Sequence, residues 1–205
     1  MEEDIFYGNL SYNLKQKSNS LDSDLKKTYN KFTDSVYIFP DLYKTSLEVD
    51  YLINNLNTNL DKDHVYNLMD RDLKTYLRDS SLSKGITEPE YNSIENSLSK
   101  FEPLILKLKE FWNRARPYQY ANLIEAPLFP IETISSHSPA YPSGHTLQGC
   151  VWARLISTVK PELKDWADSI SVKINLSRLA LGVHFPSDIE FAKKICKDLI
   201  KNKFI

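Results

Sequence analysis

The spacing of apolar residues constrains the fold of this chain more than any other feature. Large apolar side chains recur three or four positions apart, which places them on one face of an α-helix. Strict two-residue alternation, the pattern of a half-buried strand, is scarce, and only five residues are glycine. In the N-terminal part the apolar runs are Leu25, Tyr29, Phe32 and Val36; Val49, Leu52, Ile53 and Leu56; and Val65, Leu68, Met69, Tyr76 and Leu77. The pattern predicts an all-α helical bundle.

Helix-terminus signals define the next helix. Thr87-x-x-Glu90 is a capping box with Pro89 in the first turn, and it opens a helical pattern. The apolar stripe of that pattern is Ile94, Leu98, Phe101, Ile105, Leu108 and Trp112. Pro103 is expected to break or kink the helix, because proline lacks a backbone donor. The pair Arg116-Pro117 is expected to end it, because a residue before proline avoids the α conformation.

Residues 117–142 are expected to be one long irregular segment. This segment contains Pro117, Pro127, Pro130, Pro139 and Pro142. Helices are then expected over about 143–159 and 161–182. A second capping box, Ser187-x-x-Glu190, predicts the start of a last helix that runs to about residue 202.

Length and composition are typical of a soluble globular domain. The 205 residues suit one domain spanning 1–205, in which the motifs described below occupy 105–200 and residues 1–85 form a helical part without a recognisable motif. The net charge of −1 gives no electrostatic reason to expect a nucleic-acid partner. Because no apolar run approaches the roughly 18 residues of a membrane span, and no apolar leader follows the acidic start, we expect a cytoplasmic protein without a membrane span.

The two cysteines are too few for a disulfide framework. Cys150 and Cys196 each lie within an apolar helical pattern, so we expect two buried free thiols. Free thiols agree with a reducing compartment.

Three short motifs follow one another in the second half of the chain. They are Lys109-x6-Arg116-Pro117, Pro142-Ser143-Gly144-His145 and Ser177-Arg178-x5-His184-x3-Asp188. On a continuous helix, the two cations of the first motif would project from the same side about 10 Å apart. Such a pair is either a solvated face or a site where both cations converge on one anion.

The second and third motifs place polar groups at helix ends. Ser143 is a good N-cap, and Gly144 lets a ligand approach the backbone N–H groups that bind anions at a helix N-terminus. His145 then lies in the first turn. His184 is expected in a short link between helices, and Asp188 in the first turn of the last helix, where its carboxylate is able to orient one imidazole nitrogen.

Together these residues predict a phosphoryl-transfer site. Two histidines, several cations, a helix N-terminus and an orienting carboxylate are what this chemistry needs. The motifs contain no cluster of carboxylates, cysteines or histidines at metal-ligand spacing, so no metal is expected.

The three motifs resemble the signature of the type 2 phosphatidic acid phosphatase superfamily, which also contains bacterial class A acid phosphatases and vanadium-dependent haloperoxidases. The resemblance implies a helical bundle in which His184 forms a phosphohistidine, Asp188 orients it, and His145 protonates the leaving oxygen. It also implies a set of phosphate-binding residues: Lys109, Arg116, Ser143, Gly144 and Arg178. No cofactor is implied for the phosphatases.

Within the superfamily, residues 141–146 look most like the soluble acid phosphatases. Residues 161–182 carry several charges and differ from the apolar helices of membrane members. The resemblance therefore implies a phosphate-ester hydrolase with a small phosphorylated substrate, which is a nucleotide, sugar phosphate, lipid phosphate or diphosphate. A homo-oligomer is possible, since soluble relatives often self-associate.

Two alternatives remain open at this point. In a vanadium-dependent haloperoxidase, the same residues would hold vanadate as a cofactor, and His137 would be an additional site histidine. In a non-catalytic phosphate-binding helical protein, the cations would bind an anion without turnover.

Overall fold

A computed structural model describes residues 7–8, 21–34, 40–55, 69–70, 72–129 and 133–205. The regular elements in these ranges are helices, which confirms the predicted all-α class. They are α2 (Ser23–Phe32), α3 (Leu42–Asn55), α5 (Leu73–Ser83), α6 (Glu88–Ser99), α7 (Glu102–Trp112), α8 (Pro117–Leu123), η2 (Ile134–Ser136), α9 (Gly144–Val159), η3 (Pro161–Leu163), α10 (Lys164–Ala180) and α11 (Pro186–Lys201). Of the predicted apolar positions, Val36, Leu56, Val65 and Leu68 lie outside the described residues.

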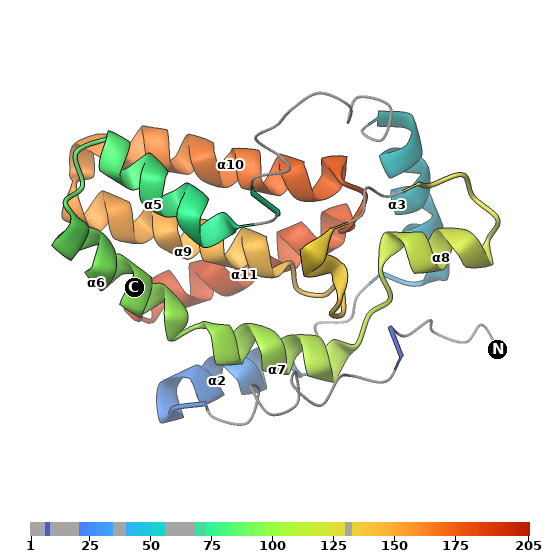
Figure 1. The fold of residues 1–205 in the computed structure, drawn as a ribbon. Coiled ribbons are helices and arrows are strands. Elements are labelled where there is room, and N and C mark those ends of the chain that lie inside the picture. Colours follow the sequence, from blue (N-terminus) through green and yellow to red (C-terminus); the bar gives the residue numbers. More distant parts are fainter. Residues whose placement is uncertain (1–6, 9–20, 35–39, 56–68, 71, 130–132) are drawn as a thin grey trace.

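Helix α9 is the central element of the bundle. Figure 1 shows it beside α10, with α5 and α6 on one side and α11 on another. One apolar cluster joins α9 to α2, α7 and α11, and a second joins it to α5, α6 and α10. A third cluster packs α3 and α8 against Phe185, in the link between α10 and α11. Three N-terminal helices thus contribute to the clusters that surround the motif-bearing helices.

Several predicted helix ends are confirmed. The Thr87 hydroxyl accepts from the backbone of Glu90 at 3.4 Å, and the Glu90 carboxylate accepts from the backbone of Thr87 at 2.7 Å. Pro103 lies in the first turn of α7, so it separates α6 from α7 as expected. Ser143 caps α9 by accepting from the backbone of Thr146 at 3.4 Å.

The expectation that Lys109 and Arg116 share a helix is wrong. Helix α7 ends at Trp112, and Asn113 adopts the left-handed conformation with φ of 43°. Asparagine tolerates that conformation better than most residues, and here its amide also donates to the Gly8 carbonyl at 3.1 Å. The chain therefore leaves the helix between the two cations.

The irregular segment predicted over 117–142 is also partly wrong. Pro117 begins α8 rather than a loop, because its fixed φ suits the first position of a helix and its missing N–H is not needed there. A short 3₁₀ turn, η2, follows within the same segment.

The predicted capping box at the last helix is wrong as well. Helix α11 begins at Pro186, one residue before Ser187. The Ser187 hydroxyl donates to Glu48 at 2.8 Å, and Glu190 pairs with Lys193 at 2.8 Å, so neither caps the helix. Instead, the Asp188 carboxylate accepts from the backbone of Phe185 at 2.9 Å.

Cys150 and Cys196 form a disulfide between α9 and α11, with Cα atoms 6.3 Å apart. The prediction of two free thiols is therefore wrong, and the inference of a reducing compartment loses its support. Each cysteine lies on an apolar face as expected, but the packing of α9 against α11 brings the two faces together. In the described part of the chain, no helix combines the length and the apolar character that crossing a membrane requires.

Candidate active site

The fold brings the three sequence motifs to one place. The backbone of Ser143 donates to the Asp188 carbonyl at 3.2 Å, which joins the second motif to the third. A Cβ atom on Gly144 would lie 3.7 Å from Cε of Lys109, which joins the second motif to the first. Arg116 Nη1 lies 2.9 Å from His184 Nε2, which joins the first to the third.

His184 and Asp188 form a buried pair. His184 Nδ1 lies 3.1 Å from Asp188 Oδ2, and the side chains are only 3% and 0% exposed. The spacing of four residues places the carboxylate in the first turn of α11, directly below the link that carries the histidine. This is the arrangement that the sequence predicts.

Arg116 determines which nitrogen of His184 carries the proton. A guanidinium only donates, so the contact of 2.9 Å requires Nε2 to be an acceptor. The proton of the neutral ring then sits on Nδ1, facing Asp188. Burial, reinforced by the charges of Arg116 and Lys109, holds the pKa of His184 well below its ordinary value. The imidazole is therefore neutral, with its lone pair on Nε2.

Lys109 and Arg116 are buried cations that lack a carboxylate partner within the described ranges. The Lys109 ammonium donates to the Pro139 carbonyl, and Arg116 donates to carbonyls of the 133–142 segment and of Val183. Burial lowers the pKa of Lys109 well below its ordinary value, and the Arg116 charge lowers it further. Burial also lowers the pKa of Arg116, to about 10. Buried charges of one sign favour a bound ion of the other sign.

Arg178 is fully buried, and only one of its three guanidinium nitrogens has a hydrogen-bond partner among the described residues. Its Nη1 donates to Asp70 at 2.8 Å and to the Ser135 hydroxyl at 3.2 Å. Among the described residues, its Nε and Nη2 have no hydrogen-bond partner. Two buried, charged donors without acceptors match the two oxygens of a bidentate anion.

His145 is half-buried in the first turn of α9. It lies close enough to the other site residues for their charges to change its pKa. Burial lowers its pKa well below the ordinary value, and Arg178, His184 and Lys109 add to this shift in that order. The neighbouring Ser143 hydroxyl caps α9 and lies 2.9 Å from the Thr146 hydroxyl. All eight predicted site residues thus lie in or beside one buried cluster.

His137 differs from the residues of this cluster in its exposure to solvent. It is exposed, at the end of η2. This exposure does not support the role of His137 as an additional site histidine in the haloperoxidase alternative.

Sequence reasoning missed four polar residues that contact the cluster: Glu48, Asp70, Arg114 and Ser135. Arg114 lies two positions before Arg116, so a second arginine in the first motif was an available signal. Glu48 and Asp70 come from the N-terminal part, where no motif marks them. Their roles depend on contacts between residues more than 65 positions apart.

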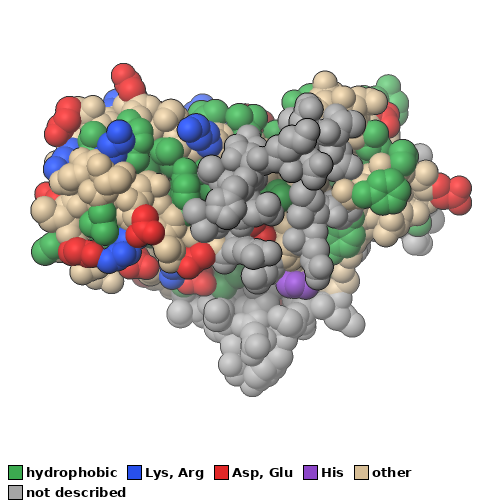
Figure 2. Space-filling model, turned by 45° about the horizontal axis from the view of Figure 1, so that its top comes forward, with side chains coloured by type: hydrophobic (Ala, Val, Ile, Leu, Met, Phe, Trp, Pro, Cys, Tyr) green, Lys and Arg blue, Asp and Glu red, His purple; other side chains and the backbone are tan. Residues whose placement is uncertain are grey.

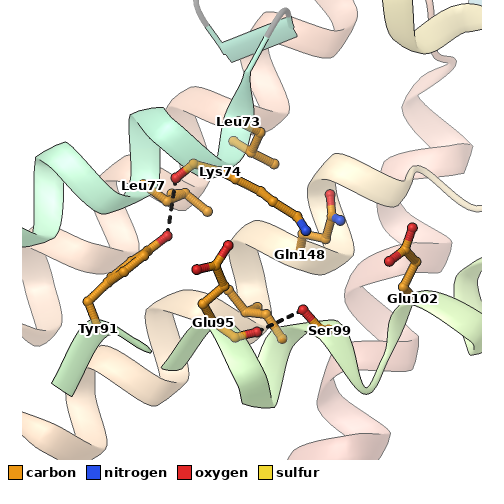
Figure 3. Close-up of a pocket in the computed structure, with 9 residues that line it drawn as sticks. Leu73, Lys74, Leu77, Tyr91, Glu95, Ser99, Glu102 and Gln148 are labelled. Atoms are coloured by element: carbon orange, nitrogen blue, oxygen red, sulfur yellow. Dashed lines mark hydrogen bonds between the residues drawn. The ribbon is translucent and has the colours of Figure 1, made fainter. Parts of the chain in front are cut away.

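A separate pocket lies between α5, α6, the start of α7, and α9, as Figure 3 shows. Its lining combines apolar side chains with Lys74, Glu95, Glu102 and Gln148, and it contains none of the eight predicted site residues. On the face seen in Figure 2, basic and acidic side chains are interspersed rather than segregated.

The fold and the cluster define a class: a helical protein with a histidine–carboxylate pair surrounded by buried cations. Residues 98–195, slightly less than half of the chain, match the model of the PAP2 superfamily.

Two known proteins are similar to the chain. A "Non-specific acid phosphatase" from Providencia stuartii is 27% identical over 92 residues, which are 45% of this chain; the match spans only 37% of the length of that relative. A fold comparison aligns 93% of this chain with 91% of a structure titled "first transmembrane PAP2 type phosphatidylglycerolphosphate phosphatase from Bacillus subtilis", at a TM-score of 0.42 and 18% identity.

Proposed function

We propose that this chain is a phosphate-ester hydrolase that acts through a phosphohistidine on His184. The observation that carries the proposal is the excess of buried positive charge around a neutral imidazole. Lys109 and Arg116 lack carboxylate partners in the described part of the chain, and Arg178 keeps two buried donors without acceptors. A phosphate group supplies both the missing charge and the missing acceptors.

In the proposed complex, the three cations bind the non-bridging phosphate oxygens. The first turn of α9 contributes backbone N–H groups, as helix N-termini do for phosphates. The Ser143 hydroxyl accepts from Thr146, so its own hydrogen remains able to donate to the ligand. Arg116 exchanges its contact with His184 Nε2 for a phosphate oxygen, which exposes the lone pair.

The first chemical step is attack of His184 Nε2 on phosphorus. The bond from phosphorus to the ester oxygen breaks, and that oxygen takes a proton from His145. Asp188 accepts the hydrogen bond from Nδ1 and stabilises the positive charge that develops on the ring. In the second step, water attacks the phosphohistidine and gives its proton to His145, which regenerates both histidines and releases phosphate.

His145 must be protonated to act as an acid, although its pKa is lowered by burial and, to a smaller extent, by the surrounding cations. A bound phosphate dianion opposes those charges and raises the pKa again. Substrate binding is therefore coupled to proton uptake, and binding of phosphate or vanadate should tighten as the pH falls. Calorimetry in buffers of different ionisation enthalpy measures this uptake; binding without proton uptake would contradict the assignment of His145.

The proposed substrate class is the phosphate monoesters, in line with the name of the acid phosphatase relative. The test is hydrolysis of p-nitrophenyl phosphate, followed by a screen of nucleotides, sugar phosphates, lipid phosphates and diphosphates. His184→Ala should abolish turnover of every substrate, whereas the exposed His137→Ala serves as a matched control with normal turnover. Binding of phosphate without hydrolysis of any ester would instead support the non-catalytic alternative.

We also propose that hydrolysis needs no metal ion, because lysine and arginine side chains neutralise the phosphate charge. Activity should survive treatment with a chelator. Loss of activity that a divalent ion restores would refute this part of the proposal.

Orthovanadate should inhibit in competition with phosphate esters, because five-coordinate vanadium resembles the transition state. Arg178→Ala should weaken vanadate binding and lower turnover together. Unchanged vanadate affinity in a folded Arg178→Ala protein would contradict the role of its two donors.

A further inference from the structure

Arg114 is the buried cation of the cluster that the proposed mechanism does not use. Its Nη1 donates to Asp188 Oδ1 at 2.6 Å and to the Ser187 hydroxyl at 2.7 Å. Its Nη2 donates to Glu48 at 3.1 Å and to the Thr45 hydroxyl at 3.2 Å. Both terminal nitrogens thus bind protein acceptors, in contrast to Nη2 of Arg178.

The contact with Asp188 fixes the rotation of its carboxylate. Oδ1 accepts from Arg114, while Oδ2 accepts from the backbone of Phe185 at 2.9 Å and faces His184 Nδ1 at 3.1 Å. Without the guanidinium, Oδ1 would be a buried oxygen without this donor, and the carboxylate would be able to rotate away from the imidazole. The orientation of His184 depends on that rotation.

Glu48 holds Arg114 in place. One carboxylate oxygen of Glu48 accepts from Arg114 and from the Ser187 hydroxyl at 2.8 Å, and the other accepts from the backbone of Ser187 at 2.7 Å. The guanidinium also lies over the Phe185 ring, 4.1 Å from its centroid. The Arg114 side chain is 3% exposed and that of Glu48 is 15% exposed, so solvent screens these contacts little.

We propose that Arg114, held by Glu48, is a positioning residue that fixes the Asp188–His184 pair. The proposal rests on the proposed function, because the pair matters only if His184 is the nucleophile. It also assigns a role to α3, since Glu48 lies outside the segment matched by the family model. The N-terminal part of the chain would then complete the site through a contact with α11.

Arg114→Gln and Glu48→Gln test the proposal. Each should lower kcat by about 10- to 100-fold, the range found when residues that orient the histidine ligands of metal sites are removed. KM for p-nitrophenyl phosphate and the affinity for inorganic phosphate should stay close to those of the unchanged protein, because neither residue contacts the phosphate. Arg78→Lys is the matched control, since Arg78 and Glu88 form an exposed ion pair elsewhere.

A second readout does not depend on activity. In ¹⁵N-labelled protein, the Nδ1 proton of His184 should give a hydrogen-bonded imidazole signal that disappears in Arg114→Gln and persists in Arg78→Lys. His184→Ala assigns the signal. If Arg114→Gln fails to fold, Glu48→Gln provides the same comparison with a smaller change.

The outcomes separate this proposal from the proposed function. A fall in kcat with the affinity for inorganic phosphate retained, together with loss of the imidazole signal, supports positioning. Parallel loss of the affinity for inorganic phosphate, or an unchanged kcat in a folded variant, overturns it. If the unchanged protein hydrolyses no phosphate ester, the proposed function fails, and the imidazole signal alone then decides whether Arg114 orients the pair.

Discussion

Replacing Lys109 with methionine tests whether this cation binds the substrate or stabilises the fold. A structural cation neutralises a buried carboxylate, and its removal costs about 3–5 kcal/mol. Lys109 has no such partner among the described residues, and its lowered pKa means that the folded protein disfavours the charged ammonium. The unfolded chain therefore holds that proton more tightly than the folded one, so the charge costs stability at neutral pH and the cost declines as pH rises toward the ordinary lysine value.

Two opposing effects set the expected magnitude for Lys109→Met. The variant loses the hydrogen bond to the Pro139 carbonyl, which contributes roughly 1.5–3 kcal/mol for a charged donor. It also removes a buried charge whose desolvation costs several kcal/mol. The net result should lie between no change and about 2 kcal/mol of added stability. For a chain of this size, that is an increase of about 0–8 °C in Tm.

The same variant should lose the response to anions. Vanadate at 100 times its Kd should stabilise the unchanged protein by about 2.7 kcal/mol, or about 5–11 °C, and Lys109→Met by much less. Thermal melts with and without vanadate measure both effects. Lys107→Met, two positions earlier on α7, is the matched control and should keep the full response. A Tm that falls by more than about 5 °C in Lys109→Met would show that Lys109 is structural.

Three further predictions concern the disulfide and the two histidines. Reducing the Cys150–Cys196 disulfide should cost about 2–4 kcal/mol in urea unfolding, since the bond closes a loop of 46 residues; an unchanged midpoint in reductant would contradict the bond. Because His145 and His184 have lowered pKa values when folded, stability should fall as pH drops below about 6.5, by up to about 1.4 kcal/mol per pH unit for each histidine. The variant lacking both histidines should lose this dependence of the unfolding free energy on pH. An unchanged pH dependence in that variant would refute the prediction. His145→Ala should slow alkyl phosphate hydrolysis by about 100- to 10,000-fold but should slow the first step with p-nitrophenyl phosphate less, and equal losses would argue against His145 as the acid.

The helical class and the contact between His184 and Asp188 could be predicted from the sequence because both depend on short-range patterns. Apolar spacing predicted the helical class, and the local signals at Thr87 and Ser143 predicted two helix starts. The spacing of four residues between His184 and Asp188 is likewise a property of one turn, so the pair was predictable before its surroundings were.

The wrongly predicted helix boundaries lie where one residue type is compatible with two backbone conformations or two positions in a helix. The apolar spacing predicts a helical conformation for Asn113, although asparagine also tolerates the left-handed conformation that ends α7. The pair Arg116-Pro117 predicts a helix end, although proline suits a helix start equally well. Lys109 and Arg116 still approach the same cluster, but the chain achieves this by turning out of the helix between them.

Contacts between distant segments had no signature in the sequence. The disulfide depends on how α9 packs against α11, and the positions of Glu48 and Asp70 depend on contacts across more than 65 residues. Polar networks of this kind lack the periodicity that makes helices recognisable. Arg114 lies between these two situations. Its position within the first motif can be read from the sequence, whereas its hydrogen-bond partners cannot.

The central claim, a covalent phosphoryl group on His184, is tested most directly by trapping it. The protein is mixed with p-nitrophenyl phosphate, quenched after the burst of nitrophenol under conditions that preserve phosphohistidine, digested and analysed by mass spectrometry. The account predicts one added phosphoryl group on the peptide that contains His184, which is absent from His184→Ala and present in His137→Ala. A protein that turns over the ester but carries the group on another residue, or shows a burst in His184→Ala, would contradict the account.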